Sequence, residues 1–456
     1  MWIEKAMLEV AAAKLFPEHT HLFLVSRSEL RRRMTVIRES FEKEARAAGG
    51  PHPPTFLHAF AVKANPMQSV LETAKAAGFG AETASIGEFK LAERIFTGAD
   101  AHKIVFDSPA KTLEELHHAL QTPCYLNVDN FAELERIIAL QRGGVAPHLP
   151  ALPTITATVG IRVNPQTVER TDNAALATGG KISKFGVGLH DGDNKERIVD
   201  YFQRYHDTIN LKMLHVHSGS QGLSLDTMVT GVQAILSELA EDPRMAPLVD
   251  VVDIGGGFPV DFSSDDETLT VADYARELRE RVPGLFTAAR PRLIITEFGR
   301  TVAAKSGVLL SRVEYVKESG GRQVVLQHAG ADLAVRTVWQ PEKWPLRVEV
   351  YDKTGKLKAQ RVDTQISEVP TDVGGPCCNS GCMLTRAAAL PADIKPLEDV
   401  VLVHDVGGYY HSAFSLYNLR QMPACYVYDA DATPRLWCVK KPQPVEDTLK
   451  LFETDV

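Results

Sequence analysis

One lysine near the amino end of the chain is placed where it could carry covalent chemistry. In the segment Phe60–Asn65, Lys63 follows an apolar, β-prone run and precedes a turn marked by Asn65 and Pro66. A lysine at a strand end can form a Schiff base with an aldehyde once its ammonium group loses a proton, and partly apolar surroundings lower its pKa in that direction. An isolated lysine of this kind is more often simply solvated, so the prediction depends on the rest of the chain.

Other reactive or charged residues also stand at the ends of β-prone runs. Barrel enzymes hold their chemistry at the carboxyl ends of their strands. We therefore expect these residues to share one mouth with Lys63. They are Glu82, Arg162 with Asn164, His217, the glycines Gly255–Gly257, and Glu297.

The runs themselves alternate with amphipathic helical stretches between Phe56 and Arg300. Eight such repeats predict an α/β fold, a (β/α)8 TIM-like barrel. The predicted strands are Phe56–Val62, Gly80–Thr83, Lys103–Phe106, Pro123–Val128, Thr156–Val163, Leu211–His217, Leu248–Ile254 and Arg292–Glu297.

Capping signals support the predicted helices. A side chain that can cap a helix stands three residues before an acid in three pairs, which is typical of helix starts. After the first pair, an apolar stripe follows with helical spacing. The pairs are Ser26 with Glu29, Thr112 with Glu115 and Asn130 with Glu133, and the stripe is Leu30, Met34, Ile37 and Phe41.

Beyond Arg300 the pattern changes to β runs joined by turns such as Glu318–Gly321 and Asp352–Gly355. This predicts a C-terminal, mostly-β domain, to which His21–Val25 could add a strand. We therefore expect a barrel over residues 26–300 and a β-rich domain from residues 1–25 and 301–456. The proline-rich stretch Pro147–Pro153 is predicted to be a loop within the barrel.

Composition excludes several classes of protein. The chain has 456 residues, of which 44% are hydrophobic and 24% charged, and its net charge is −8. Because nucleic acids and anionic membranes attract concentrated positive charge, we expect neither as a partner. Met1–Lys5 places an acid and a base where a signal peptide needs an apolar core. These features predict a cytoplasmic protein.

The predicted mouth offers what a pyridoxal phosphate enzyme needs, beginning with a lysine and an anion cradle. The backbone N–H groups of Gly255–Gly257, with Gly256 and Gly257 at its centre, can approach a phosphate closely. Ser220 and Arg300 could complete the cradle, with charge-assisted hydrogen bonds from the arginine. A triple glycine by itself is more often only a tight turn.

Glu297 and His217 supply the remaining parts. A carboxylate against the pyridine nitrogen keeps that nitrogen protonated, so the ring can stabilise a carbanion at the substrate Cα, which suits loss of CO₂. A lone glutamate of this kind is more often a surface ion pair. His217 could stack on the cofactor ring, and a hydrogen-bonded barrel histidine is an equally good interpretation of that residue alone.

Taken together, these motifs resemble one known family. In sequence order they match the fold-type III pyridoxal phosphate decarboxylases, the family of diaminopimelate and ornithine decarboxylases, from about residue 22 to about residue 420. The motifs that carry the resemblance are Phe60–Asn65, His215–Gln221, Asp253–Pro259, Glu297–Arg300, Gly375–Cys378 and Gly407–Tyr409.

The resemblance implies roles for individual residues. Lys63 looks like the lysine that forms the Schiff base, His217 like the ring-stacking histidine and Glu297 like the pyridinium partner. Cys378 resembles a catalytic cysteine that reaches the neighbouring subunit's site, which implies a homodimer with shared active sites. Ser220, Gly257, Arg300 and Tyr409 look like phosphate contacts, and Arg162, Ser183–Gly186 and Glu82, which replaces a usual aspartate, match positions that support the site.

Cys377, Cys378 and Cys382 allow other interpretations. A zinc site is disfavoured, because three thiols lack a clear fourth ligand and two of them are adjacent in the chain. Three packed structural thiols are a better alternative than zinc. A thiol at Cys378 also suits a general acid that returns a proton to Cα.

Several positions depart from the family. Decarboxylases of basic amino acids hold an acid directly after the catalytic cysteine, where this chain has Asn379. A second acid is replaced by Cys382, and a third position falls around Gln327–His328. A buried ammonium without a carboxylate partner is costly. The sequence therefore predicts an acyl-modified, neutral or acidic side chain on the substrate, and Arg336 could bind a distal carboxylate.

The predicted activity is pyridoxal phosphate-dependent decarboxylation of an amino acid through a Lys63 aldimine and a quinonoid. Diaminopimelate decarboxylation proper is one alternative. A racemase is another, although such enzymes of this fold place an arginine, not a glutamate like Glu297, near the pyridine nitrogen. A catalytically inactive relative that only binds a partner is a third alternative, which retention of Lys63, Cys378 and Glu297 disfavours.

Overall fold

The computed structural model describes residues 2–13, 18–143, 146, 148–168, 178–265, 267, 269–358 and 367–454. They form two compact units. The barrel unit comprises Arg32–Val260 and Thr268–Val302, and the β-rich unit comprises Met1–Arg31, Asp261–Glu267 and Ala303–Val456. The domain boundaries expected from the sequence stay a prediction.

Eight parallel strands close into a barrel in the barrel unit, as the sequence predicts. Seven neighbour pairs run from β2 round to β10, and pairing of β10 with β2 closes the ring. A short strand β7 (Val187–Gly188) pairs with β6 outside the ring. The barrel strands are β2 (Thr55–Ala61), β3 (Gly80–Thr83), β4 (Ile104–Asp107), β5 (Tyr125–Val128), β6 (Thr158–Asn164), β8 (Leu211–His215), β9 (Val251–Asp253) and β10 (Leu293–Thr296).

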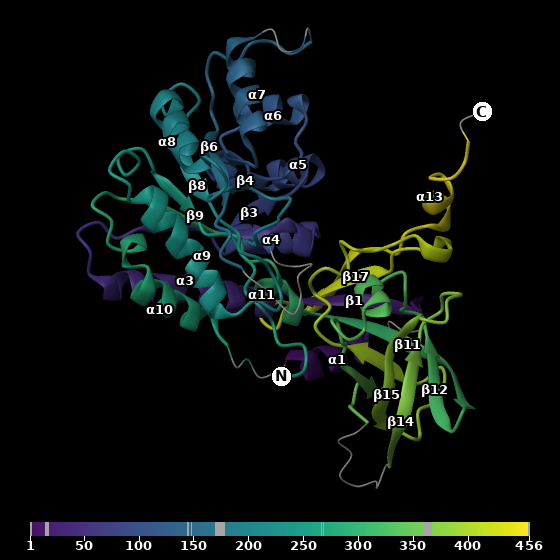
Figure 1. Cartoon of the computed structure of the whole chain (residues 1–456). Helices are drawn as coiled ribbons and strands as arrows, with labels where there is room; N and C mark the ends of the chain where they lie inside the picture. Colours follow the sequence, from purple (N-terminus) through teal and green to yellow (C-terminus); the bar gives the residue numbers. More distant parts are fainter. Residues whose placement is uncertain are drawn as a thin grey trace. The chain divides into compact units, whose positions relative to one another are not determined.

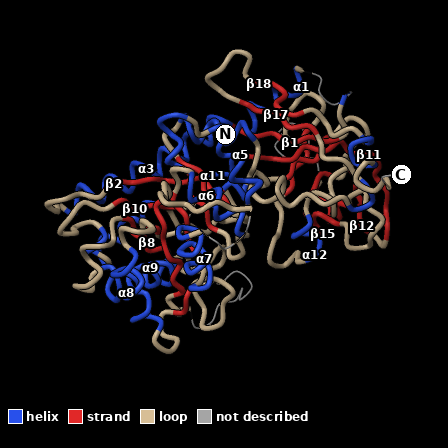
Figure 2. The backbone as a smooth tube through the Cα atoms, turned by 90° about the horizontal axis from the view of Figure 1, so that it is seen from above, coloured by secondary structure: helices blue, strands red, loops and turns tan. Residues whose placement is uncertain are grey.

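Helices lie outside these strands, as the ribbon and the view from above both show (Figures 1 and 2). Each crossover from one parallel strand to the next needs such a connection, because a tight turn cannot join parallel neighbours. The helices are α3 (Arg27–Ala48), α4 (Gln68–Ala76), α5 (Ile86–Ile95), α6 (Leu113–Gln121), α7 (Phe131–Arg142), α8 (Asn194–Tyr205), α9 (Leu225–Ile235), α10 (Val271–Arg281) and the short α11 (Arg300–Ala303).

The predicted capping side chains are in place at the helix starts. The Ser26 hydroxyl accepts a hydrogen bond from the Glu29 N–H at 3.1 Å. Thr112 forms a reciprocal capping box with its acid three residues on. The Asn130 side chain accepts from the Glu133 N–H at 3.0 Å. All three caps confirm the predicted starts of α3, α6 and α7.

Helix α3 buries the predicted apolar stripe. Leu30, Met34, Ile37 and Phe41 are each no more than 2% exposed. The ring of Phe41 lies 5.4 Å from that of His58 on β2 and 5.6 Å from that of Phe56. The 3.6-residue period of the stripe therefore docks α3 against the outside of the barrel.

The β-rich unit is built on a second sheet. Its strands follow the order β15-β14-β12-β11-β1-β17-β18, and β16 pairs with both β11 and β13. Strand β1 (His21–Ser26) lies antiparallel to β11 and parallel to β17, so the predicted strand His21–Val25 is confirmed. The other strands are β11 (Gly307–Ser319), β12 (Arg322–Gln327), β13 (Val348–Tyr351), β14 (Glu368–Gly374), β15 (Met383–Pro391), β16 (Val400–Val403), β17 (Ala424–Tyr428) and β18 (Leu436–Lys440).

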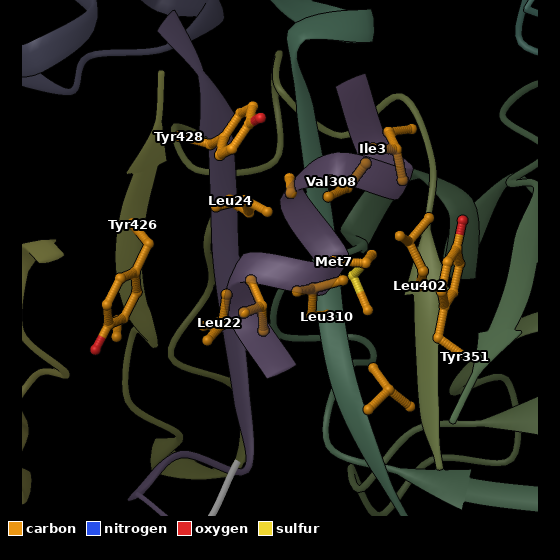
Figure 3. Close-up of a cluster of buried hydrophobic side chains, with 14 residues drawn as sticks. Ile3, Met7, Leu22, Leu24, Val308, Leu310, Tyr351, Leu402, Tyr426 and Tyr428 are labelled. Atoms are coloured by element: carbon orange, nitrogen blue, oxygen red, sulfur yellow. The ribbon is translucent and has the colours of Figure 1, made fainter. Parts of the chain in front are cut away.

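A helix at the amino end, α1 (Trp2–Ala12), covers one face of this sheet. Its side chains Ile3 and Met7 point into a buried cluster formed with residues of β1, β11, β13, β16 and β17 (Figure 3). Burying such side chains away from water contributes about 1.5–3 kcal/mol each. This helix was not predicted from the sequence. Two short helices, α12 (Val335–Trp339) and α13 (Val445–Leu449), complete the unit.

Two further expectations concern segments outside the core. Pro147 of the predicted loop lies outside the described residues, and residues 148–153 contain neither helix nor strand. Among the helices that the structure describes, none is both long and apolar enough to cross a membrane.

Candidate active site at the carboxyl ends of the barrel strands

The barrel interior changes from apolar to polar along its strands. Because side chains alternate between the two faces of a strand, residues two apart both point inward. On four strands an apolar residue of one buried cluster is followed two residues later by a polar residue that is at most 6% exposed. The pairs are Val105 and Asp107, Met213 and His215, Val251 and Asp253, and Ile295 and Glu297.

Lys63 stands at this mouth, in the single turn Val62–Ala64 that follows β2. Its Nζ donates to both carboxylate oxygens of Glu82 at 2.8 Å. Burial raises the pKa of Glu82, and the positive charge of Lys63 partly opposes that shift. A buried proton acceptor thus lies within hydrogen-bond distance of the lysine that must lose a proton to become a nucleophile.

Carboxylates converge around this pair. Oxygens of Glu82, Asp107 and Glu297 all lie within 4.8 Å of one another. The guanidinium of Arg162 donates to Asp107 at 2.8 Å. Burial would raise the pKa of Asp107, but the positive charges led by Arg162 lower it overall. Arg162 therefore keeps one carboxylate of the cluster ionised, in the supporting position predicted for it.

Glu297 is the third carboxylate of this cluster, and the positive charge of Lys63 opposes only part of its pKa shift. Burial, followed by the negative charges of Asp253 and Glu82, raises the pKa of Glu297 well above its ordinary value. Within the described part of the chain, its Oε1 atom has no hydrogen-bond partner. A protonated ring nitrogen of pyridoxal phosphate would supply the charge that favours ionised Glu297, so the residue fits the predicted pyridinium partner.

His217 lies beyond the end of β8, because that strand stops at His215 and not at the predicted residue 217. The Gly256 N–H donates to its Nδ1 at 3.0 Å, which places the ring proton on Nε2. Burial, then the charge of Arg162, lowers the pKa of His217 well below its ordinary value. A neutral, fixed ring suits the predicted stacking role.

The residues predicted to form an anion cradle lie close together. Gly255 and Gly257 have φ angles of +66° and +91°, in the region that favours glycine. A Cβ on Gly257 would lie 1.8 Å from the carbonyl oxygen of Gly219. Nearby, Arg300 donates to the Ser220 hydroxyl at 3.4 Å. A guanidinium, a hydroxyl and closely approaching backbone together fit a phosphate group.

Gly257→Ala is expected to destabilise the protein by at least about 3 kcal/mol, because the left-handed backbone and the clash with Gly219 both oppose a side chain. The matched control is Gly78→Ala. Gly78 also has a positive φ, +84°, but a Cβ there meets nothing within 4 Å, so about 1 kcal/mol is expected. Urea unfolding of both variants measures the difference. Equal losses in the free energy of unfolding would contradict the close approach of Gly257 to the Gly219 carbonyl.

The remaining predicted residues belong to the β-rich unit. Cys378 is exposed, and its N–H donates to the Asn418 side chain at 2.8 Å. Cys377 and Cys382 are buried, and pack with Ala331 and Val338. Burial, then the charge of Asp332, raises the pKa of Cys377 to about 12. This supports packed structural thiols at two of the three cysteines and leaves only Cys378 accessible to a substrate.

Arg336 and Tyr409 lie together in the β-rich unit. The Arg336 guanidinium donates to the Tyr409 carbonyl at 3.3 Å. It also lies 4.2 Å from the ring centre of Trp344, 5.0 Å from that of Tyr409 and 5.5 Å from that of Tyr410. Cation–π contacts of this kind hold a guanidinium in place.

The side chains of Asn379 and Gln327 form hydrogen bonds with backbone groups. The Asn379 side chain accepts from the Gly381 N–H at 2.6 Å. The Gln327 amide donates to the carbonyls of Ala329 and Gly374, at 2.6 and 3.1 Å. Neither position offers a carboxylate to a substrate ammonium, as the sequence predicts.

Three buried polar residues at the ends of barrel strands were not predicted to belong to the site. They are Asp107, His215 and Asp253. The period-two alternation could have found each of them, since each follows an inward apolar residue. His215 lies 3.7 Å from Glu297 and 3.8 Å from Asp107. Asp253 accepts hydrogen bonds from the Gly255 N–H at 2.9 Å and from Asn127 at 3.2 Å, and its burial raises its pKa to about 7.

Comparison with known proteins agrees with this geometry. Residues 34–304 match the family model described as "Pyridoxal-dependent decarboxylase, pyridoxal binding domain". A diaminopimelate decarboxylase of Helicobacter pylori is 31% identical over 79% of this chain and 81% of its own length. One from Zymomonas mobilis is 28% identical over 91% of this chain and 90% of its own length.

The fold is similar as well. The crystal structure of Helicobacter pylori diaminopimelate decarboxylase complexed with L-lysine superposes with a TM-score of 0.76 at 26% sequence identity, covering 97% of this chain and 99% of that one. The matched residues include both the barrel and the β-rich sheet. The family match, the relatives and the converging site residues agree, and the chain belongs to the pyridoxal-dependent decarboxylases, carboxy-lyases that use pyridoxal phosphate.

Proposed function

We propose that this decarboxylase acts on an amino acid with a carboxylate at its far end, and that diaminopimelate is the leading candidate. The observation that carries the decarboxylase chemistry is the convergence of Lys63, Glu82 and Glu297 at one barrel mouth. The relatives named above are diaminopimelate decarboxylases, which supports this substrate over the non-basic one that the sequence favoured.

Several residues of the chain have separate proposed roles in the reaction. Lys63 gives up a proton to Glu82, to which it is hydrogen-bonded at 2.8 Å. Glu297 would keep the ring nitrogen of bound pyridoxal phosphate protonated, and neutral His217 would lie against the ring. Bound pyridoxal phosphate supplies the electron sink for the pair left at Cα when CO₂ departs. One proton must then be added to Cα, and the exposed thiol of Cys378 is the proposed donor, with water as the alternative.

Arg336 is the residue that favours a substrate with a distal carboxylate. Its guanidinium lies against three aromatic rings, and we assign it as the proposed partner of that carboxylate through charge-assisted hydrogen bonds. Diaminopimelate carries such a carboxylate at its far end, whereas lysine and ornithine do not.

A second candidate rests on Asn379. Diaminopimelate also carries a distal ammonium, and neither Asn379 nor Gln327 offers that group a negative charge. An acyl-modified diamino acid would need no carboxylate there, because its distal nitrogen is neutral.

A substrate panel separates the two candidates. We expect CO₂ release from diaminopimelate to exceed that from lysine or ornithine by at least about a hundredfold in kcat/KM, because two charged contacts to the distal carboxylate are lost. N-acyl diamino acids test the second candidate. Interconversion of enantiomers without CO₂ release would contradict a decarboxylase and favour a racemase.

Asn379→Glu is expected to raise kcat/KM for diaminopimelate by about tenfold, since the added carboxylate can pair with the distal ammonium. Ser380→Glu adds the same charge at the next, exposed position and serves as the control. A fall in kcat/KM that is unique to Asn379→Glu would instead support a neutral distal group.

We also propose a homodimer in which Cys378 serves the partner's site. The barrel unit supplies Lys63 and the β-rich unit supplies an exposed Cys378. Co-expressed Lys63→Ala and Cys378→Ala chains, carrying different tags, are then expected to recover about a quarter of wild-type activity, because half of the dimers hold one intact site of two. No recovery in purified mixed dimers would show that each chain uses its own cysteine.

A further inference from the structure

Cys378, the proposed proton donor, is bonded through its backbone to one turn of the β-rich unit, residues 415–420. Its N–H donates to the side-chain oxygen of Asn418 at 2.8 Å, and the two residues are 40 positions apart in the chain. Its carbonyl accepts from the Tyr417 hydroxyl at 3.5 Å. Two adjacent residues of this turn therefore bond both backbone polar groups of the cysteine.

Buried Asp332 anchors the 415–420 turn at both of its ends. Its carboxylate accepts from the Arg420 Nε at 2.8 Å, and its backbone carbonyl accepts from the Ser415 N–H at 2.9 Å. Its second carboxylate oxygen accepts from the thiol of Cys377 at 3.7 Å. The turn and the residue directly before Cys378 are thus bonded to the same buried side chain, which fixes one relative to the other.

The backbone of this turn adopts an uncommon conformation. Asn418 and Leu419 have φ angles of +57° and +53°, in the left-handed region that asparagine tolerates and leucine rarely enters. Such a conformation persists where the surrounding contacts impose it, and it is common at functional sites. The contacts of Asp332 therefore hold the turn in a shape that brings the Asn418 side chain to Cys378.

The place of the thiol matters because two carbons compete for its proton. The electron pair left when CO₂ departs is shared between the substrate Cα and the cofactor carbon that came from its aldehyde. A proton added to Cα gives the amine and restores pyridoxal phosphate, and the thiolate regains a proton from water. A proton added to the cofactor carbon gives pyridoxamine phosphate once water releases the substrate as an aldehyde. The position of the donor decides between the two.

We propose that Asn418 is a positioning residue that places the thiol of Cys378 to protonate Cα and not the cofactor. Its hydrogen bond fixes the backbone of Cys378, and Asp332 fixes the turn that carries Asn418. Asn418 has this role only if Cys378 is the proton donor, as proposed above. The variants chosen below test the donor and its placement separately.

The ratio of pyridoxamine phosphate formed to CO₂ released measures misplaced protonation in the holoenzyme. The probe is diaminopimelate, or whichever amino acid of the substrate panel releases CO₂. Asn418→Gly tolerates the positive φ but loses the acceptor, and it is expected to raise the ratio at least about tenfold. Asn418→Asp keeps an oxygen acceptor and should stay within about threefold of the wild type. A loss of folded protein would lower both products alike and leave the ratio unchanged.

The matched control is Asn210→Gly, the same substitution at the same φ of +57°. The Asn210 side chain donates to the Ala157 carbonyl at 2.8 Å, directly before β8 and at the opposite end of the barrel from the mouth. This variant should keep the wild-type ratio.

Cys378→Ala tests the donor itself and should raise the ratio at least as much as Asn418→Gly. Adding Asn418→Gly to Cys378→Ala should raise it no further, because both changes act through one thiol. A wild-type ratio in Cys378→Ala would overturn the donor role and the positioning role with it. A raised ratio in Cys378→Ala with a wild-type ratio in Asn418→Gly would overturn the positioning role alone.

Discussion

Lys63→Ala is expected to lower CO₂ release from the amino-acid substrate at least about a thousandfold, because alanine has no amine with which to form the Schiff base. The purified variant should also lose the yellow colour of a covalently held cofactor. Release of CO₂ and the visible absorption spectrum measure the two effects on the same preparation.

The control for this variant is Lys90→Ala, which removes an exposed lysine from helix α5. It should keep both activity and colour. Because Lys63 pairs with buried Glu82, the Lys63→Ala protein must also be checked for folding. A folded Lys63→Ala protein that still releases CO₂ at the wild-type rate would contradict the assignment.

Glu297→Gln is expected to lower CO₂ release about a hundred- to a thousandfold while the protein keeps its cofactor. Glutamine has nearly the same shape, but it cannot hold the negative charge that stabilises a proton on the ring nitrogen. The loss should appear mainly in kcat, because this charge matters most when electrons move into the ring.

The comparison variant is Glu277→Gln, which makes the same change on helix α10, away from the barrel interior. It should behave as wild type. Activity of Glu297→Gln within about threefold of the wild type would contradict the role of the charge and would favour a chemistry that needs less electron withdrawal, such as racemisation.

Much of the barrel could be predicted because its strands are buried β-prone runs between capped helices. The predicted ends of the strands were less accurate. The sequence predicts Leu248–Ile254, whereas β9 spans only Val251–Asp253. Pairing with neighbouring strands, which an apolar pattern does not reveal, determines where a strand stops. His217 lies in a loop for this reason, and its ring is fixed by the Gly256 N–H.

The sequence singled out Lys63 and Glu297 because these residue types have few uses at a strand end, and their roles stay a prediction. Asp107, His215 and Asp253 were missed because an inward polar residue can equally well stabilise a barrel without doing chemistry. Their significance comes from distances between strands, such as the 3.7 Å that separates His215 from Glu297. The local hydrogen bond of Asn379 to Gly381 likewise depends on a turn that the sequence alone does not define.

The most direct test of the central assignment is to locate the cofactor on the chain. Borohydride reduction of the holoenzyme fixes a lysine-bound pyridoxal phosphate as a stable amine, and peptide mass spectrometry then identifies the modified residue. We expect one modified peptide, containing Lys63. Modification of a different lysine, or none in a protein that binds the cofactor and releases CO₂, would contradict it.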